Sequence, residues 1–152
     1  MQPIIKTAGI EDVKIIAPLF DAYRVFYQQK TDIEAAASFL SERLSKNEST
    51  IFIAFINETA VGFTQLCPVF SSVSLKPAWL LNDLYVAEKA RKQGVANALL
   101  NKAKEFGIEK NAKWLLLETA FDNYNAQALY EQNGWIKQTD LFYQFALSPS
   151  II

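Results

Sequence analysis

The stretch of the chain that decides its fold runs from Leu84 to Asn97 and reads LYVAEKARKQGVAN. An apolar strand ends, a short charged loop follows, and a helix begins at Gly94. The first turn of a helix has unpaired backbone N–H groups and the positive end of the helix dipole, so it attracts phosphate. Gly94 and the small Ala96 let an anion approach the backbone closely. Arg91 and Lys92 add positive charge, so the stretch predicts an anion site that needs neither metal nor histidine.

The same pattern, taken alone, also fits an ordinary strand–loop–helix junction with a solvated basic pair. The chain has 5 glycines, and none of them fits the phosphate-loop pattern GxxxxGK[ST] or the dinucleotide-binding pattern GxGxxG. Nucleotide hydrolysis and dinucleotide redox chemistry therefore have no support in the sequence.

Outward from this stretch, the spacing of apolar residues divides the chain into further strands and helices. We expect strands at 3–8, 51–56, 60–70, 78–86, 114–118 and 141–147. We expect helices at 10–28, at 32–46 with Asp32 as N-cap, from 94 to about 110, and one that ends near 133 before Gly134. Pro18 suggests a kink or an early helix boundary. The order βααβββαβαβ is typical of an α/β fold with a mixed sheet, in a single domain over residues 1–152.

Composition narrows the classes of function. The chain has 15 basic and 16 acidic residues, a formal net charge of −1, which argues against a nucleic-acid-binding protein. No apolar run approaches the roughly 18 residues that span a bilayer, and charged residues interrupt the N-terminal apolar stretch where a signal peptide has none. We therefore expect a cytoplasmic protein with no membrane partner and no nucleic-acid partner.

Two further features of the composition restrict the chemistry. The chain has no histidine, which excludes Ser–His and Cys–His nucleophilic pairs and histidine metal sites. The single Cys67 builds neither a thiolate zinc site nor an intrachain disulfide, and we interpret it as a buried strand residue. One free cysteine also suits a reducing compartment. Chemistry must then rest on carboxylates, tyrosines, lysines, backbone amides or a bound cofactor, with no metal expected.

Two motifs resemble those of a known family. The segment RKQGVA, residues 91–96, is similar to the R/Q-x-x-G-x-G/A signature of the GNAT superfamily of acetyl-CoA-dependent N-acetyltransferases. The segment NYNAQALYEQNGW, residues 123–135, resembles the family's N-x-x-A-x-x-L-Y-x-x-x-G-F/W pattern. The motifs stand in the family's order, separated by one strand. The resemblance implies a GNAT-like mixed, mainly antiparallel central sheet flanked by helices, and acetyl-CoA as cosubstrate.

The resemblance also implies which residues hold acetyl-CoA. In the loop and the first helical turn these are Arg91, Lys92, Gln93, Gly94, Val95, Ala96 and Asn97. The backbone of Leu84, Tyr85 and Val86 pairs with the pantetheine arm. Asn123 touches the cofactor near that arm, and Tyr130 lies near the thioester sulfur. Ala96 stands where many members of the family have glycine.

Acetyl transfer to an amine requires that the amine lose a proton, that the oxyanion meet donors, and that the departing thiolate receive a proton. The resemblance makes Tyr130 the acid, although its helical spacing alone also fits a core tyrosine. Asp83, in an apolar strand, is a candidate base, an anchor for the substrate ammonium, or a structural carboxylate. Many relatives carry a glutamate on this strand where the chain has Asn82 beside Asp83. Glu118 is the second candidate base.

Substrate contacts are expected from four aromatic residues: Tyr23, Tyr27, Phe70 and Trp79. Aromatic rings beside a carboxylate suit an amine through cation–π contact and ion pairing, although rings at helical spacing are more often core. We expect an N-acetyltransferase that acts on a small-molecule amine. The alternatives are a protein lysine or N-terminal acetyltransferase, and a non-catalytic CoA-binding regulatory module. The branch of the family that the chain resembles also implies a possible homodimer.

Overall fold

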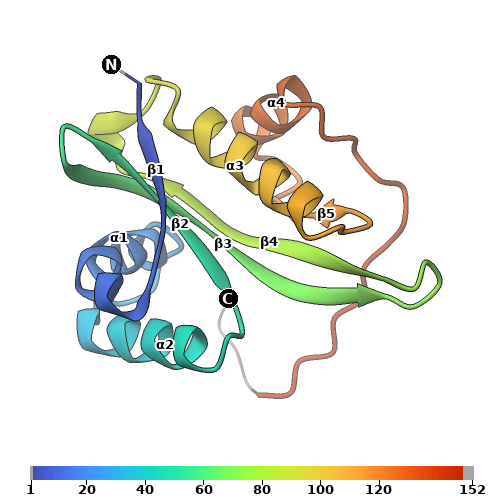
Figure 1. The fold of residues 1–152 in the computed structure, drawn as a ribbon, viewed down its shortest axis with the longest axis horizontal. Helices are drawn as coiled ribbons and strands as arrows, with labels where there is room; N and C mark the ends of the chain where they lie inside the picture. Colours follow the sequence, from blue (N-terminus) through green and yellow to red (C-terminus); the bar gives the residue numbers. More distant parts are fainter. Residues whose placement is uncertain (1, 149–152) are drawn as a thin grey trace.

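Five strands form one sheet in the order β1-β2-β3-β4-β5, with α1 and α2 on one face and α3 and α4 on the other (Figure 1). The computed structural model describes residues 2–148 of the chain. The elements are β1 (Ile4–Thr7), the 3-10 turn η1 (Ile10–Asp12), α1 (Val13–Phe26), α2 (Ile33–Ser45), β2 (Thr50–Ile56), β3 (Thr59–Ser71), β4 (Lys76–Val86), η2 (Glu88–Ala90), α3 (Val95–Glu109), β5 (Leu115–Leu116) and α4 (Tyr124–Gln132).

The sheet is mixed and mainly antiparallel, which confirms the predicted fold class. Strands β1 to β4 pair antiparallel with their neighbours, and β4 and β5 pair parallel. The hairpin β2–β3 turns at Asn57 and Glu58, both with positive φ. Within residues 2–148, no helix is long and apolar enough to cross a membrane.

Alternation along β2 separates two cores, because successive strand side chains point to opposite faces of the sheet. Ile51 and Ile53 pack with Ile16, Leu40 and other residues of α1 and α2. Phe52 and Ala54 pack with the buried stripe of α3: Val95, Leu99, Leu100, Ala103 and Phe106. Each helical layer therefore covers one face of the same strands.

The helix ends follow the local sequence. Asp32 caps α2 as predicted, with its side chain accepting a hydrogen bond from the Ala35 amide at 3.0 Å. Gly134 follows α4 with φ +86, as predicted for a left-handed stop. A helix boundary at Pro18 was one of two expectations for that residue, and it is wrong: α1 runs without interruption from Val13 to Phe26.

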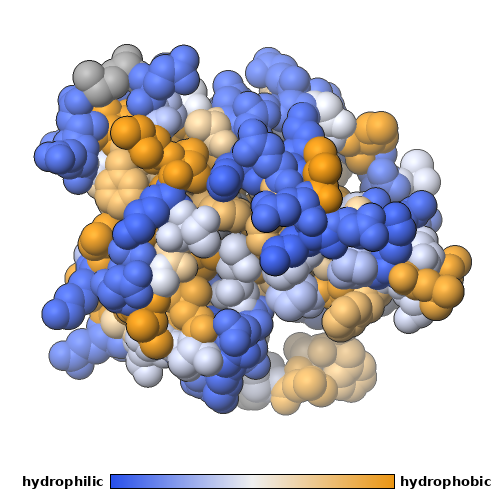
Figure 2. All heavy atoms as spheres, in the orientation of Figure 1, coloured by the Kyte–Doolittle hydropathy of each residue, from blue (hydrophilic) through white to orange (hydrophobic). Residues whose placement is uncertain are grey.

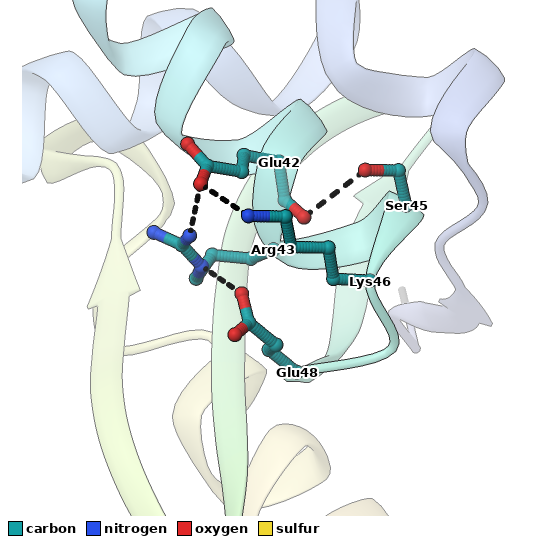
Figure 3. Close-up of polar contacts among 5 residues, drawn as sticks. All are labelled: Glu42, Arg43, Ser45, Lys46 and Glu48. Carbon is teal, nitrogen blue, oxygen red and sulfur yellow. Dashed lines mark hydrogen bonds and ion pairs between the residues drawn. The ribbon is translucent and has the colours of Figure 1, made fainter.

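A small network of ion pairs links the end of α2 to the loop before β2 (Figure 3). Glu42 accepts from Lys46 at 2.8 Å and from Arg43 at 3.0 Å, and Arg43 also pairs with Glu48 at 2.8 Å. The Arg43 guanidinium lies 4.8 Å from the centre of the Phe39 ring. Exposed ion pairs contribute little individually, so this network orients the α2–β2 connection more than it stabilises the fold.

The last predicted strand, 141–147, is wrong for the described part of the chain. Residues 135–148 carry no helix or strand and run as a single extended trace from α4 (Figure 1). The predicted strand 114–118 shrinks to Leu115–Leu116. A strand needs a hydrogen-bonded neighbour as well as an alternating pattern, and β5, the last strand in the sheet, pairs only with β4. The pattern of apolar residues alone therefore predicts more strand than either segment forms.

Leu99 is fully buried between α3 and the sheet, so Leu99→Ala leaves a cavity there. We expect the variant to lose about 2–5 kcal/mol of unfolding free energy, measured by urea denaturation. The matched control is Leu75→Ala in the β3–β4 hairpin, where the leucine is 91% exposed and a change below about 0.5 kcal/mol is expected. Equal losses in the two variants would contradict this assignment of the core.

Candidate functional site

The central feature of the site is a gap between β4 and β5. The two strands pair only at Trp79 with Leu115 and at Leu80 with Leu116. Beyond Leu80, β4 continues to Val86, and no strand among residues 2–148 pairs with it on that side. Its backbone groups there are free to pair with an extended ligand, and groups from both faces of the sheet can meet at the gap.

An irregularity in the β3–β4 ladder turns Asp83 toward α1. Gln65 pairs with Asp83 and Leu66 with Leu81, so Asn82 is an extra residue on β4. Leu81 packs in the α3 core, whereas Asp83 lies beside Tyr23 of α1. The extra residue therefore changes which face of the sheet receives the next side chain.

Asp83 is buried and held by two side-chain amides. Its carboxylate accepts from Gln65 Nε2 at 2.6 Å and from Asn82 Nδ2 at 3.1 Å, while the Thr64 hydroxyl donates to the Asp83 backbone oxygen at 2.8 Å. These donors fix the carboxylate in place. The buried Gln65 Oε1 has no hydrogen-bond partner within the described residues. Asp83 is thus positioned rather than free to rotate.

Tyr23 of α1 lies beside Asp83, and two further tyrosines lie near Tyr23. The ring of Tyr23 lies 5.1 Å from that of Tyr27 and 6.0 Å from that of Tyr85. Tyr130 of α4 lies near Tyr23 and Tyr27. Tyr23 and Tyr27, with Arg24 and Gln29, line an open hollow of about 380 Å³. The structure therefore places Asp83 beside Tyr23, and Tyr27 and Tyr130 near Tyr23, although the sequence singled out these four residues separately.

Burial keeps two of these phenols protonated. Burial is the main cause that raises the pKa of Tyr23, and the nearby Asp83 carboxylate is the second cause. Burial, with a smaller effect from Tyr27, raises the pKa of Tyr130. Desolvation disfavours the charged phenolate, so both hydroxyls remain hydrogen-bond donors at neutral pH. A protonated Tyr130 is able to donate a proton to a leaving group.

The anion loop ends where α3 begins. Gly94 precedes the first helical turn with φ +80, in the left-handed region, and nothing lies within 4 Å of where its Cβ would be. The first helical hydrogen bond runs from the Ala98 amide to the Gly94 oxygen at 3.0 Å. The preceding amides of Val95, Ala96 and Asn97 therefore have no intrahelical acceptor and stand at the positive end of the helix dipole.

Arg91 joins the loop to the aromatic cluster. Its Nε donates to the Val86 oxygen at 3.0 Å, and its guanidinium lies 5.8 Å from the Phe26 ring centre and 5.9 Å from that of Tyr85. Gln93 donates to the Lys89 oxygen at 3.1 Å. The charge of Arg91 is therefore held at the end of β4, between the loop and α1.

The second motif forms α4 and its contact with α3. The Asn123 side chain accepts from the Ala126 amide at 3.2 Å, so its oxygen is used in capping α4. At the other end of the helix, Asn133 donates to Asn97 at 2.8 Å. Tyr130 lies between these ends, half-buried, with its ring 6.2 Å from that of Trp135. Both motifs therefore stand at one end of the gap.

Other candidates lie away from this cluster. Phe70 is 79% exposed in the β3–β4 hairpin, about 16 Å along the strand from the position opposite Asp83. Trp79 packs on Phe106 at 4.7 Å, in the α3 core. Glu118 is exposed in the irregular chain after β5. The tyrosines of α1, rather than Phe70 and Trp79, thus line the space beside Asp83.

Cys67 is half-buried in β3, and burial, with the Asp83 charge, raises the pKa of its thiol. A raised pKa lowers the fraction of thiolate, the nucleophilic form. This environment agrees with the interpretation of Cys67 as a strand residue rather than an acyl carrier.

Sequence reasoning missed three residues that shape the site. Thr64 and Gln65 are polar residues within an apolar strand, a signal that the sequence offered, and they hold Asp83. Phe26 lies next to Arg91, at the end of α1, and only the fold reveals this proximity. Two polar residues buried in an apolar strand therefore indicate a polar group nearby, here the Asp83 carboxylate and its backbone oxygen, to which they donate hydrogen bonds.

The chain is similar to known proteins over most of its length. Residues 16–135 match the model of the acetyltransferase (GNAT) family. The chain is 47% identical to the uncharacterized N-acetyltransferase YhfO of Bacillus subtilis, over 89% of this chain and 91% of that protein. It is 34% identical to a probable acetyltransferase of Haemophilus influenzae, over 90% of this chain and 93% of that protein. The crystal structure of a probable acetyltransferase superimposes with a TM-score of 0.92 and 41% identity, covering 97% of this chain and 99% of that chain.

The raised pKa of Tyr130 is measurable by carbon NMR of chains with labelled tyrosine side chains. We expect its resonance to stay at the phenol position at pH 10, where N-acetyltyrosinamide, with a pKa of about 10, is half ionised. Tyr130→Phe assigns the resonance, and Tyr23→Phe does the same for Tyr23. A Tyr130 resonance that titrates together with the model compound would contradict the buried environment described here.

Proposed function

The chain belongs to the GNAT family of acetyltransferases, and from that premise we propose that it transfers the acetyl group of acetyl-CoA to the primary amine of a small molecule. The family makes the protein an acetyl-transferring enzyme. The observation that supports the finer proposal is the position of Asp83 on β4 beside Tyr23, with Tyr27 and Tyr130 near Tyr23. The amine attacks the acetyl group directly, in a ternary complex of enzyme, acetyl-CoA and amine.

The chain's residues fit acetyl-CoA. Open space at Gly94, the free amides of the first turn of α3 and the fixed charge of Arg91 suit the pyrophosphate. On its β5 side, the backbone of residues 81–86 in β4 pairs with no strand among residues 2–148, and it suits the amide groups of the pantetheine arm, which pair like a strand. When bound, acetyl-CoA supplies an acetyl group activated as a thioester.

Asp83 and Tyr130 have complementary proton roles in this proposal. Asp83 holds the substrate ammonium and takes its proton, directly or through water, since an alkylammonium with a pKa of about 10 is not nucleophilic. A free N–H of β4 stabilises the negative charge that develops on the acetyl oxygen. Tyr130, kept protonated by burial, gives its proton to the departing sulfur. Each role requires only side chains and amides that meet at the gap.

The hollow beside α1 suits a small amine. Tyr23 and Tyr27 offer aromatic faces that attract a cation, and Asp83, which is not part of the lining, supplies the opposite charge beside Tyr23. The hollow is open to solvent and about 380 Å³ in volume, within the range of small-molecule sites. These features support a small primary amine as the acceptor.

Acetyl-CoA binding tests the anion loop. We expect a double variant, Arg91→Glu with Gly94→Asp, to bind acetyl-CoA at least about 100-fold more weakly in titration calorimetry, because two negative charges then face the pyrophosphate. The matched control is Lys104→Glu, a charge reversal on the exposed side of α3, which should bind like the wild type. A folded wild-type protein that binds no acetyl-CoA would refute the proposal.

Turnover of an amine tests the proton roles. A screen of primary amines for CoA release first identifies an acceptor. We then expect Tyr130→Phe and Asp83→Asn each to lower kcat by about 10²–10⁴-fold, with acetyl-CoA affinity unchanged. Glu118→Gln should retain activity, because its side chain is exposed beyond β5. A loss in Glu118→Gln with none in Asp83→Asn would transfer the base role to Glu118. Full activity in Tyr130→Phe would refute its role as acid.

A further inference from the structure

The hollow beside α1 has a single charged residue in its lining, which consists of Tyr23, Arg24, Tyr27 and Gln29. Arg24 is half-buried in the last turn of α1. No carboxylate among residues 2–148 forms an ion pair with its guanidinium. The hollow therefore presents a positive charge to whatever ligand enters it.

The charge of Arg24 also acts on the buried carboxylate of Asp21, but that group is already used by the connection between α1 and α2. Its Oδ2 accepts from the Thr31 hydroxyl at 2.6 Å, and its Oδ1 accepts from the Asp32 amide at 2.7 Å. The hydrogen bond from the Asp32 amide is the main cause that lowers the pKa of Asp21, and the Arg24 charge adds a smaller effect. Asp21 therefore holds the connection rather than the guanidinium.

The same connection positions Arg24. Its Nη1 donates to the Lys30 oxygen at 3.3 Å, and its backbone oxygen accepts from the Gln29 amide at 3.0 Å. Lys30 directly precedes Thr31, which Asp21 holds, so the acceptor for Arg24 has a fixed place. A guanidinium has five N–H donors, and its other donors remain available to a ligand.

Opposite charges lie on the two groups that Tyr23 links. Tyr23 is part of the lining that contains Arg24, and it also lies beside the Asp83 carboxylate. A ligand that follows the Tyr23 side chain from the hollow to Asp83 thus meets a positive group first and a negative group last. This order suits a ligand with an anion at one end and an ammonium at the other.

We propose that the acceptor amine also carries a carboxylate, which Arg24 binds in the hollow while the amine reaches Asp83; this inference rests on the proposed function. The planar fork of a guanidinium matches a carboxylate through two parallel hydrogen bonds. The side-chain amide of Gln29 offers a further donor in the same lining. Because Asp83 lies outside the lining, the acceptor class is an amino acid whose amine and carboxylate are separated by a short chain.

Two other classes of amine fit these observations less well. A diamine would place its second ammonium beside Arg24, where like charges repel. A protein acceptor would need a broad contact surface with an apolar centre. On the face that Figure 2 shows, apolar and hydrophilic residues are instead interspersed over α1 and α2. A small acceptor with a carboxylate therefore agrees best with the hollow.

Three amines with the same four-carbon chain test this class. The far end of the chain is negative in γ-aminobutyrate, neutral in γ-aminobutyramide and positive in putrescine. We expect kcat/KM, measured by CoA release, to be about 10-fold or more higher for γ-aminobutyrate than for putrescine, with the amide between them. The comparison is repeated with shorter and longer chains.

Variants of Arg24 test its role in this preference. We expect Arg24→Gln to remove the preference, mainly by raising KM for γ-aminobutyrate, with acetyl-CoA affinity unchanged. Arg24→Lys should retain part of it, because the charge remains and the fork is lost. The matched control is Lys14→Gln, an exposed lysine in the first turn of α1, which should behave like the wild type. Circular dichroism checks that each variant is folded.

A carboxylate without an amine gives an independent measurement. Butyrate should inhibit the wild type competitively against the amine and not against acetyl-CoA, and it should inhibit Arg24→Gln about 10-fold more weakly or less. Equal turnover of the three amines, a preference for putrescine, or a preference that survives in Arg24→Gln would overturn the inference and leave the acetyltransferase proposal intact. Turnover only of amines that lack a carboxylate would do the same. CoA release with no primary amine at all would instead refute the proposed function, and the inference with it.

Discussion

The separation of β4 from β5 after only two residue pairs is the constraint on which the site depends. Because the two strands are parallel, the chain must cross from one end of the sheet to the other between them, and α3 makes that crossing. A crossover helix begins near the carboxyl end of the strand before it, so the amides of α3 necessarily open beside Val86. The separation then leaves the backbone of β4 unpaired beside those amides. One topological fact thus provides both the anion loop and the strand edge.

A second constraint acts within β4. If the ladder were regular, Asp83 would point to the same face as Leu81, into the apolar core under α3. The extra residue Asn82 reverses the alternation, so that Asp83 meets Tyr23 instead and Asn82 itself donates to the carboxylate. Gln65 on the neighbouring strand supplies the other donor. An apolar strand accommodates a buried carboxylate here because the irregularity both turns it and partners it.

Features that depend on a few neighbouring residues were predictable from the sequence. The helix start at Gly94, the Asp32 cap and the end of α4 before Gly134 each follow from local backbone preferences. Features that depend on pairing between distant parts of the chain were not predictable from the sequence. The face that Asp83 occupies depends on its register with Gln65, and the contact of Arg91 with Phe26 depends on how α1 lies over β4. The large apolar residues of 141–147 predicted a strand, but no local pattern specifies which strand such a segment pairs with.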